Sequence, residues 1–458
     1  MAGGRFARRA WGDLGGDPAL LGRVEPPGTA VPLPSSLAVG ELAFDSVAVA
    51  SLAADLVRAV REPGGEVAAI RVDPGRVAGS YRSERVFRWN GRAVDAWSGL
   101  SGFWEAADGW VRTHGNYPHH AQRLRTLLGL AADAGPGEVR RAIAGRGAAE
   151  LEDAAASTGA VVGAVRDAAT WAEHPQARAI AGRPLVVRRR LGPAAPRPWP
   201  ERGPLPLAGI RVLDLTRVIA GPVATRDLAF AGAQVLRVDD PRLPEIGWQH
   251  LDTGQGKRSA TLDLRAPDGL AALHGLIERA DVVVTGYRPG SLDRYGLAPE
   301  ALAERHPGVV VGQVSAWDTA GPWRGRRGFD SIVQAVIGIA LAESGDGRTP
   351  GALPAQALDH SAGHLLAAAI MVGLCRQRAE GGSHAVSVAL ARVGHELLST
   401  PGATEPPAVP GEAPTVTGAG PAGEITCAAP ALAFRGAPAA YAWVGHPWGA
   451  DPARWDKS

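Results

Sequence analysis

Apolar, strand-like runs alternate with helix-like segments between residues 207 and 315, and this alternation constrains the fold more than any other feature. The runs are GIRVLDL (209–215), QVLRV (234–238), DVVVT (281–285) and VVVGQV (309–314). Helical patterns of about ten residues separate them, several of which begin at a proline. Strands separated by helices form βαβ units around a parallel sheet. The sequence therefore predicts an α/β fold.

Proline- and glycine-rich segments divide the chain into regions of different composition. Residues 192–206 (GPAAPRPWPERGPLP) and 399–423 are predicted to be extended linkers, since proline restricts the backbone. We expect a large domain with a parallel, Rossmann-like sheet and a smaller α+β domain. The predicted regions are a poorly ordered segment at 1–40, a small-domain region at 41–191, the linker 192–206, the large domain at 207–398, the linker 399–423, and a tail at 424–458 that packs back on the protein.

The composition excludes several classes of protein. Lysine and arginine total 48 and aspartate and glutamate 46, which disfavours a polybasic nucleic-acid binder. The two cysteines, Cys375 and Cys427, cannot build a disulfide framework, and no C-x-x-C zinc motif is present. No apolar core of a signal peptide follows Arg8 and Arg9, and the apolar stretch 365–375 is shorter than the roughly 18 residues of a membrane span. We expect a cytoplasmic protein with no membrane or nucleic-acid partner.

The carboxyl ends of the predicted strands are where a ligand should bind, because open parallel sheets place their sites at that edge. The loops there are 216–221, the segment from Asp239 onward, 286–290 and 315–321. The first loop has one glycine and lacks G-x-G-x-x-G, which disfavours a dinucleotide site. The loop 286–290 (GYRPG), followed by Arg294, is either a surface turn with two solvated arginines or a phosphate clamp.

Three other features each allow a structural and a functional interpretation. Lys257 is unexpected in a chain whose basic residues are nearly all arginine, and is either solvated or functional. The histidines of 114–120 (HGNYPHH) lack a nearby carboxylate or cysteine, so we expect a polar surface or interface rather than a metal site. Asp359 precedes an apolar helix; it is either an N-cap or a nucleophile, since acyl transfer can pass through an anhydride on a carboxylate.

Five ordered motifs resemble the class III coenzyme A-transferase family, which also contains α-methylacyl-CoA racemases. They cover about 207–398 and are PLAGIRVLDLTRVIAGPVATRDLAFAGAQVLRVDDP, GKRSATLDLR, ADVVVTGYRPGSLDRYGL, RRGFDSIVQAVIGIA and LPAQALDHSAGHLLAA. The resemblance implies that 207–398 is the coenzyme A (CoA)-binding catalytic domain. It also implies that 41–191 corresponds to the family's C-terminal half, placed here before the catalytic part as if the chain were permuted.

The resemblance implies a mechanism and a set of site residues. Asp359 matches the family's catalytic aspartate, which attacks the acyl-CoA thioester; the mixed anhydride releases CoA, which reaches the acceptor acid through an aspartyl-CoA thioester. CoA would be a substrate, with no tightly bound cofactor and no metal, and the protein would be a homodimer. The residues expected to contact CoA are Val218, Ile219, Ala220, Leu262, Arg265, Gly286, Tyr287, Arg288, Arg294 and Ser315.

Two departures from the family pattern leave alternatives open. The racemases carry a histidine base between a glycine and an aspartate, where this chain has Phe329. Phenylalanine cannot carry a proton, which favours a transferase over a racemase or isomerase. The second departure is the rearranged order of the segments. In addition, the glycine-rich lid loop of some transferases has only a weak candidate here, at 418–423. A non-catalytic CoA-binding subunit is therefore a further alternative. Many relatives have a basic residue at the position of Asp240, for which Arg242 could substitute.

Overall fold

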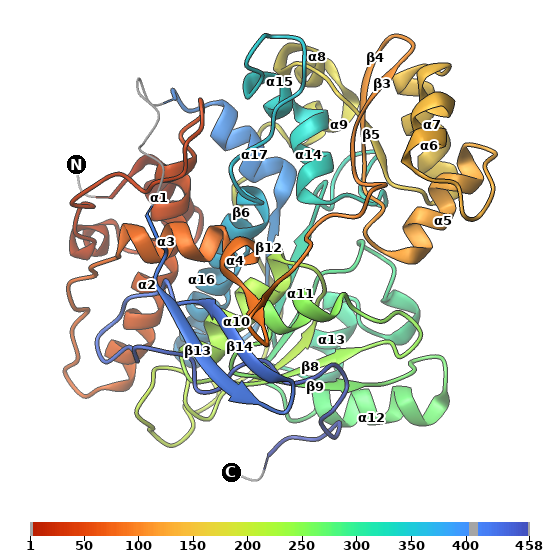
Figure 1. Cartoon of the computed structure of the whole chain (residues 1–458). Helices are drawn as coiled ribbons and strands as arrows, with labels where there is room; N and C mark the ends of the chain where they lie inside the picture. The colour runs from red at the N-terminus through yellow and green to blue at the C-terminus, as the bar shows by residue number, and fades with distance from the viewer. Residues whose placement is uncertain (1–2, 403–410, 457–458) are drawn as a thin grey trace.

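The computed structural model describes residues 3–402 and 411–456, and a seven-stranded sheet forms its centre (Figure 1). The strand order is β6-β12-β11-β10-β7-β8-β9, and neighbours are parallel except for β6, which runs antiparallel to β12. The strands are β6 (Val186–Gly192), β7 (Arg211–Leu215), β8 (Gln234–Asp239), β9 (Lys257–Thr261), β10 (Val282–Thr285), β11 (Val310–Ser315) and β12 (Ser383–Ala389). The predicted α/β fold is confirmed.

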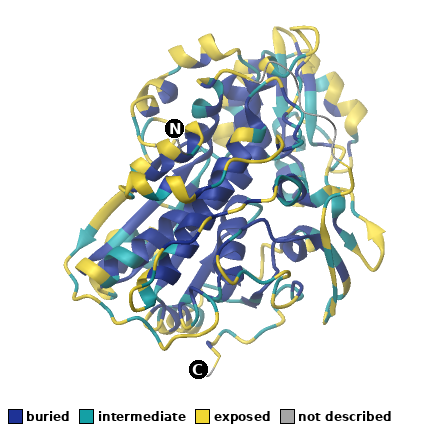
Figure 2. Ribbon diagram, turned by 90° about the vertical axis from the view of Figure 1, so that its left-hand side faces the viewer, coloured by how far each residue is buried: buried dark blue, intermediate teal, exposed yellow. Residues whose placement is uncertain are grey.

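Alternate residues of the central strands pack on opposite faces of this sheet. In β10, Val282 and Val284 belong to one apolar core and Val283 to another, as the period of two along a strand requires. The first core includes α10 (Ala220–Phe230), α16 (Ala357–Glu380) and α2 (Val39–Arg61); the second includes α12 (Pro267–Ile277) and α13 (Pro299–Arg305). Burial on both faces explains why these strands are almost continuously apolar (Figure 2).

The elements predicted for the large domain form with small shifts of their ends, and one helix differs. The apolar run 329–342 (FDSIVQAVIGIALA) has the composition of a single helix, but Gly338, whose φ is +107°, ends α14 (Asp330–Ile337) before α15 (Ile339–Ala342). The sequence analysis did not identify β9 and β12, whose sequences KRSAT and SHAVSVA carry several polar residues.

Shorter elements connect the core to the surface. Those not described elsewhere are η1 (Pro18–Arg23), α3 (Pro74–Tyr81), α4 (Ser83–Val86), β1 (Arg88–Trp89), β2 (Arg92–Ala93), α8 (Ala168–Glu173), α9 (Pro175–Ile180), α11 (Gly247–Asp252), η2 (Asp293–Tyr295) and α17 (Leu390–Leu398).

The N-terminal forty residues were expected to be poorly ordered, and for residues 3–40 this expectation is wrong. Helix α1 (Arg5–Asp13) buries Phe6 and Trp11, which are 1% exposed. The spacing of its apolar residues places them on one helix face. The backbone N–H of Ala7 also donates a 3.0 Å hydrogen bond to the Asp45 carboxylate of α2. Burial of apolar residues at helical spacing orders this segment, although glycine and proline are frequent around it.

A smaller α+β unit lies beside the large sheet, at the upper right of Figure 1. Its antiparallel sheet contains β3 (Gly102–Ala106), β4 (Gly109–Thr113) and β5 (Val162–Ala164), covered by α5 (Pro118–Leu127), α6 (Pro136–Ala144) and α7 (Ala148–Thr158) around a separate apolar core. The predicted small-domain region 41–191 extends beyond this unit at both ends. Helix α2 packs on α16 in the main core, and β6 is the edge strand of the large sheet.

The predicted linker 399–423 contains part of a β-hairpin. Strand β13 (Thr415–Gly420) pairs with β14 (Gly423–Ala428), and both join β1 and β2 in a four-stranded sheet. The rest of this linker includes 403–410, which lie outside the described residues. The C-terminal segment packs against β9 and α12. Asp451 accepts a hydrogen bond from Ser259 N of β9, and Trp455 Nε1 donates one to Leu276 O of α12.

The segment that follows α2 resembles in sequence the segment that follows α16. Each helix is followed by a glycine pair and then by similar sequences, AIRVDPGRVA (69–78) and AVSVALARVG (385–394). The two helices also pack against each other in the core. When the alignment of these two segments is extended toward the N-terminus without a gap, Ala43 of α2 aligns with Asp359 of α16. When the two glycine pairs are aligned instead, Leu42 takes this position. The carboxylate of α16 therefore has an apolar residue as its counterpart in α2.

Helix α16 is the longest helix among the described residues and forms the centre of the first core. By length and composition it could cross a membrane, but 94% of its most apolar window is buried inside the protein. Its apolar surface is therefore covered by α2, α10 and the sheet, as in the core helix of a globular domain.

Lys257 is buried beneath the turn that joins β7 to α10. Its Nζ lies 3.2 Å from the Asp214 carboxylate and donates hydrogen bonds to Thr225 Oγ1 and the Pro222 carbonyl, at 2.6 and 2.7 Å. Burial lowers the pKa of Lys257 to about 8. Asp214 also accepts a hydrogen bond from Thr216 N at 2.9 Å. This network fixes the start of the turn, so the interpretation of Lys257 as a solvated side chain is wrong.

We expect Lys257→Met to destabilise the protein by about 3–5 kcal/mol, because it leaves Asp214 buried without its counter-ion. Arg189→Met is the matched control, since the exposed Arg189–Glu300 pair should contribute less than about 1 kcal/mol. Urea unfolding of the two variants and the parent measures both changes. Equal free energies of unfolding for the two variants would contradict the structural role of Lys257.

Candidate active site

Three of the predicted loops meet at one edge of the large sheet. Strands β7, β10 and β11 are neighbours, so the segments after them lie side by side at their carboxyl ends. The side chains and backbone of these segments line a cavity of about 290 Å³, here called cavity B. Its lining includes Val218, Ala220, Gly286, Tyr287, Arg288 and Ser315.

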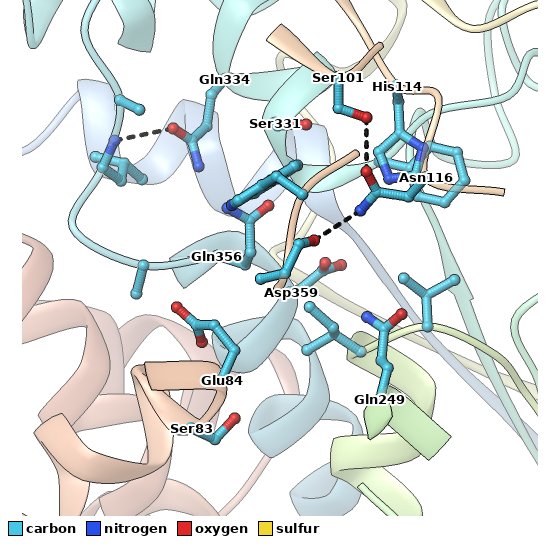
Figure 3. Close-up of a pocket in the computed structure, with 18 of the residues that line it drawn as sticks. Ser83, Glu84, Ser101, His114, Asn116, Gln249, Ser331, Gln334, Gln356 and Asp359 are labelled. Atoms are coloured by element: carbon cyan, nitrogen blue, oxygen red, sulfur yellow. Dashed lines mark hydrogen bonds between the residues drawn. The ribbon is translucent and has the colours of Figure 1, made fainter. Parts of the chain in front are cut away.

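A second cavity of about 300 Å³, here called cavity A, lies on the other side of Asp359. It is lined by the smaller α+β unit, by the chain around α4 and α11, and by the segment that leads into α16. Figure 3 shows Asp359 near its centre, with Ser101 and Asn116 on one side and Glu84 on the other. Asp359, Val218 and Phe329 line both cavities. The Asp359 carboxyl group therefore lies where the two cavities meet.

Asp359 lies in the first turn of α16 and does not cap it. The N-cap residue is Gln356, whose side chain makes no capping hydrogen bond. Instead the backbone N–H of Asp359 donates a 2.9 Å hydrogen bond to Asp330, the first residue of α14. The interpretation of Asp359 as an N-cap is thus wrong. A carboxylate from another helix binds the free N–H at the start of α16 and leaves the Asp359 side chain directed at the cavities.

Two buried carboxyl groups lie close together here, and both have raised pKa values. Burial, and then the charge of Asp330, raise the pKa of Asp359 well above its ordinary value. Burial also raises the pKa of Asp330 to about 6, although hydrogen bonds from Asp359 N and Gln334 act in the opposite direction. A poorly solvated carboxylate is a stronger base, and a stronger nucleophile, than one exposed to water.

The wall shared by the two cavities has a strained backbone. Val218 has φ of +72°, a left-handed conformation that is rare for a β-branched residue. Its N–H donates to Glu245, which also contacts Arg237 at 3.0 Å and Arg217 at 3.5 Å. Glu245 is buried, but these two arginines lower its pKa to about 2. A permanently charged carboxylate therefore holds Val218 in place between the cavities.

Most of the sequence-predicted contact residues meet at these cavities, and three do not. Val218, Ala220, Gly286, Tyr287, Arg288 and Ser315 line cavity B, and Ile219 lines cavity A with Val218. Arg265 is held by Asp263 at 3.0 Å, and Arg294 stacks on Tyr295 at 4.7 Å. Leu262 packs against the second apolar core. These three lie outside the lining of both cavities, and every one of these contacts with CoA stays a prediction.

The structure also shows where Arg242 and the candidate lid loop lie relative to the cavities. Arg242 pairs with Asp240 at 2.8 Å and with Asp263 at 3.3 Å, so Asp240 partly neutralises the arginine expected to substitute for it. Residues 418–423, the weak candidate for a lid loop, are the end of β13, the two-residue turn and the first residue of β14, and they line neither cavity.

The histidines of 114–120 belong to the walls of the cavities. The His114 ring lies flat on the Phe329 ring, with 3.7 Å between their centroids, and lines cavity A; His119 and His120 line cavity B. No group of three potential metal ligands occurs among the described residues. Burial lowers the pKa of His114 to about 3, so its ring is neutral at physiological pH. The expected interface is present, between the smaller unit and the large sheet.

Sequence reasoning missed the basic end of cavity B. Arg327 lines it beside Arg288, and within the described chain its side chain makes no ion pair. Burial, then the charges of Arg288 and Arg123, lower the pKa of Arg327 to about 10. Mutual repulsion among guanidinium groups is relieved when an anion binds. The segment RGRRGFD around Arg327 carried the signal, but the arginine-rich composition concealed it.

The fold and this site define an α/β protein with a ligand site at the carboxyl edge of a parallel sheet. The family model described as CoA-transferase family III matches residues 207–437, and the chain belongs to this family. A probable fatty acyl-CoA transferase, Rv3272 of Mycobacterium tuberculosis, is 32% identical over 198 residues, 40% of this chain and 50% of the relative. Succinyl-CoA:glutarate CoA-transferase of Homo sapiens is 34% identical over 191 residues, 38% of this chain and 43% of the relative.

Solved structures match the chain over a similar share. A crystal structure of Rv3272 is 31% identical with a TM-score of 0.41, and covers 43% of this chain and 58% of that one. A CAIB/BAIF family protein from Brucella suis is 26% identical with a TM-score of 0.39, and covers 43% and 56%. The chain spans about half the length of the curated relatives it matches.

We expect Asp359→Asn to stabilise the protein at alkaline pH. The pKa of Asp359 is higher in the folded than in the unfolded chain, so folded-state stability falls as the pH rises from the ordinary carboxyl range toward the folded pKa. Each pKa unit corresponds to about 1.4 kcal/mol. Asparagine removes this loss, so the gain over the parent should grow from about pH 4 to about pH 8.

Urea unfolding across this pH range measures the difference. Asp268→Asn is the control, because Asp268 also lies in the first turn of a helix but is exposed. A gain for Asp359→Asn that is no larger at pH 8 than at pH 4 would show that the folded chain does not raise the pKa of Asp359.

Proposed function

We propose that the protein is a coenzyme A-transferase in which Asp359 is the nucleophile. The observation that carries this proposal is the position of one buried carboxyl group at the junction of two cavities. A transferase must bring a thioester and an acid to the same atom in turn, and it needs no metal or energy source, because one thioester replaces another. Membership of CoA-transferase family III, and relatives named as CoA-transferases, support CoA transfer.

The chemistry proceeds in two symmetrical halves. An Asp359 oxygen attacks the thioester carbonyl of the donor; the C–S bond breaks, CoA leaves as a thiolate, and an acyl-aspartyl anhydride forms. The thiolate then attacks the aspartyl carbonyl of the anhydride, which releases the donor acid as its carboxylate and leaves an aspartyl-CoA thioester. The acceptor carboxylate attacks this thioester and expels the thiolate, which then attacks the acceptor acyl carbon. The new acyl-CoA forms and the Asp359 carboxylate returns.

Cavity B is the proposed site of CoA. Its basic end, with Arg288 and Arg327, suits phosphate groups, and the narrow lining of Val218, Gly286 and Ser315 suits an extended pantetheine arm. Cavity A then receives the acyl group of the donor and, afterwards, the acceptor acid. Since Asp359 faces both cavities, the thiol and the acyl carbon can reach it from opposite sides.

Racemisation of an acyl-CoA is the weaker candidate. The basic ring nearest to Phe329 is that of His114, whose pKa of about 3 is too low to take a proton at neutral pH. Solvent deuterium in the α-carbon of a 2-methylacyl-CoA would support this alternative. The expected homodimer and cytoplasmic location stay predictions, as does the choice between an enzyme and a non-catalytic CoA-binding subunit.

Asp359→Asn should abolish transfer and leave CoA binding unchanged. We expect at least about a thousandfold loss of CoA exchange between a panel of acyl-CoAs and acids. Hydroxylamine added with acyl-CoA should convert Asp359 of the parent to a hydroxamate, which peptide mass spectrometry detects. Asp268→Asn serves as the control. Exchange by Asp359→Asn at the parent's rate would disprove the proposal, whereas CoA binding with no exchange on any pair in the parent would favour the non-catalytic subunit.

Arg327→Gln should weaken the binding of acyl-CoA by about tenfold, with a smaller dependence of affinity on salt, because one phosphate contact is lost. Arg324→Gln is the matched control: Arg324 lies three residues away in the same segment, is exposed and lines neither cavity. Calorimetric titration with CoA at two salt concentrations measures both changes. Equal affinities for the two variants would place the phosphates elsewhere.

A further inference from the structure

Cavity A contains an arginine, Arg112, that forms no ion pair with any described residue. Arg112 lies on β4, and its guanidinium stacks over Trp97 and Phe103 at 5.0 and 4.8 Å from their ring centroids. Its Nε is buried and makes no hydrogen bond, and within the described residues its side chain makes no ion pair. Burial alone lowers its pKa to about 10, and no carboxylate contributes. Arg112 is therefore a charged group that the folded chain leaves uncompensated.

The other charged groups of cavity A are differently placed. Arg85 lies 3.6 Å from Glu84, whose pKa burial raises to about 7. Figure 3 shows Glu84 across Asp359 from Ser101 and Asn116, which belong to the smaller α+β unit with Arg112. Asp252 accepts a hydrogen bond from Ser83 and is buried. The acidic groups thus lie with α4 and α11, whereas Arg112 is carried by the smaller unit.

Arg112 and Asp359 line the same cavity, whose volume of about 300 Å³ suits a short carbon chain. His114 lies directly after the end of β4, two residues beyond Arg112, and both residues line cavity A. The His114 ring covers Phe329. Phe329 in turn lines cavity A with Asp359. The lining of cavity A therefore combines the guanidinium, flat aromatic rings and the Asp359 carboxyl group with the Ser101 hydroxyl and the Asn116 amide.

We propose that Arg112 binds the second carboxylate of a short dicarboxylic acid whose first carboxylate, free or as a CoA thioester, reacts at Asp359. A guanidinium forms two parallel hydrogen bonds with a carboxylate, and stacking on Trp97 and Phe103 fixes its plane for that contact. An anion here would also compensate the charge that the chain leaves unpaired. The role of the first carboxylate rests on the proposed transferase function; the binding of the second does not.

Calorimetric titration with matched acids tests the inference. Glutarate and valerate have the same number of carbons and differ in the second carboxylate, as do succinate and butyrate. We expect the parent to bind each diacid at least tenfold more tightly than its monoacid, and Arg112→Gln to remove this preference. Arg140→Gln is the matched control, because Arg140 also stacks on a tryptophan of the smaller unit but is exposed and outside the cavity.

Arg112→Lys gives a second test that does not depend on the folding of Arg112→Gln. Lysine keeps the positive charge but cannot form two parallel hydrogen bonds with a carboxylate, so this variant should retain only part of the preference for the diacid over the monoacid. Equal affinity of the parent for diacid and monoacid, or an unchanged preference in Arg112→Gln, would overturn the inference.

The same acids used as acceptors in CoA exchange separate this inference from the proposed function. Diacid binding that depends on Arg112, with no exchange on any donor, would support the site and disprove the transferase. Exchange that proceeds equally well with valerate and glutarate would support the transferase and disprove the role of Arg112.

Discussion

The hydrogen bond from the Asp359 backbone to Asp330 is the interaction on which the site depends. It joins α14 to the first turn of α16 and uses one carboxylate to hold the other where two cavities meet. Both carboxyl groups are buried, and burial together with the charge of Asp330 makes ionisation of Asp359 more costly. The protein thereby keeps a poorly solvated carboxyl group, the proposed nucleophile, in a fixed position, at a cost in stability that the large apolar core around α16 offsets.

The rest of the site is built on rigid parts of the fold. The Lys257–Asp214 ion pair fixes the start of the turn after β7, and Glu245 accepts a hydrogen bond from Val218 N. These contacts hold Val218 in its strained conformation. The smaller α+β unit closes the site from the opposite side, with His114 stacked on Phe329. The two cavities therefore meet at one carboxyl group, an arrangement that suits the proposed exchange of a thiol between two acids.

The sequence was sufficient for four central strands of the large sheet, β7, β8, β10 and β11, because they are buried on both faces. Val282, Val283 and Val284 form an apolar run that has few alternatives to a central strand. It was also sufficient for the loops after β7, β10 and β11, since parallel strands bring those ends together. Strand β9, at the sheet edge, is too polar to be recognised in the same way.

The remaining features depend on tertiary contacts that no local pattern reveals. Lys257 could not be assigned because its partners are 32 to 43 residues away. Arg112 and Arg327 could not be distinguished from other arginines until the structure showed which arginines line a cavity and form no ion pair with a described carboxylate. Ordered packing of α1 was missed because glycine and proline dominate the composition around it.

Transfer of oxygen from acceptor acid to Asp359 tests the central claim most directly. In the proposed chemistry an oxygen of the acceptor carboxylate stays on the aspartyl carbonyl when the anhydride is cleaved. After turnover with an acceptor labelled with oxygen-18, the peptide that contains Asp359 should therefore carry the label, as measured by mass spectrometry. An Asp359 peptide that remains unlabelled while labelled acyl-CoA accumulates would contradict the account.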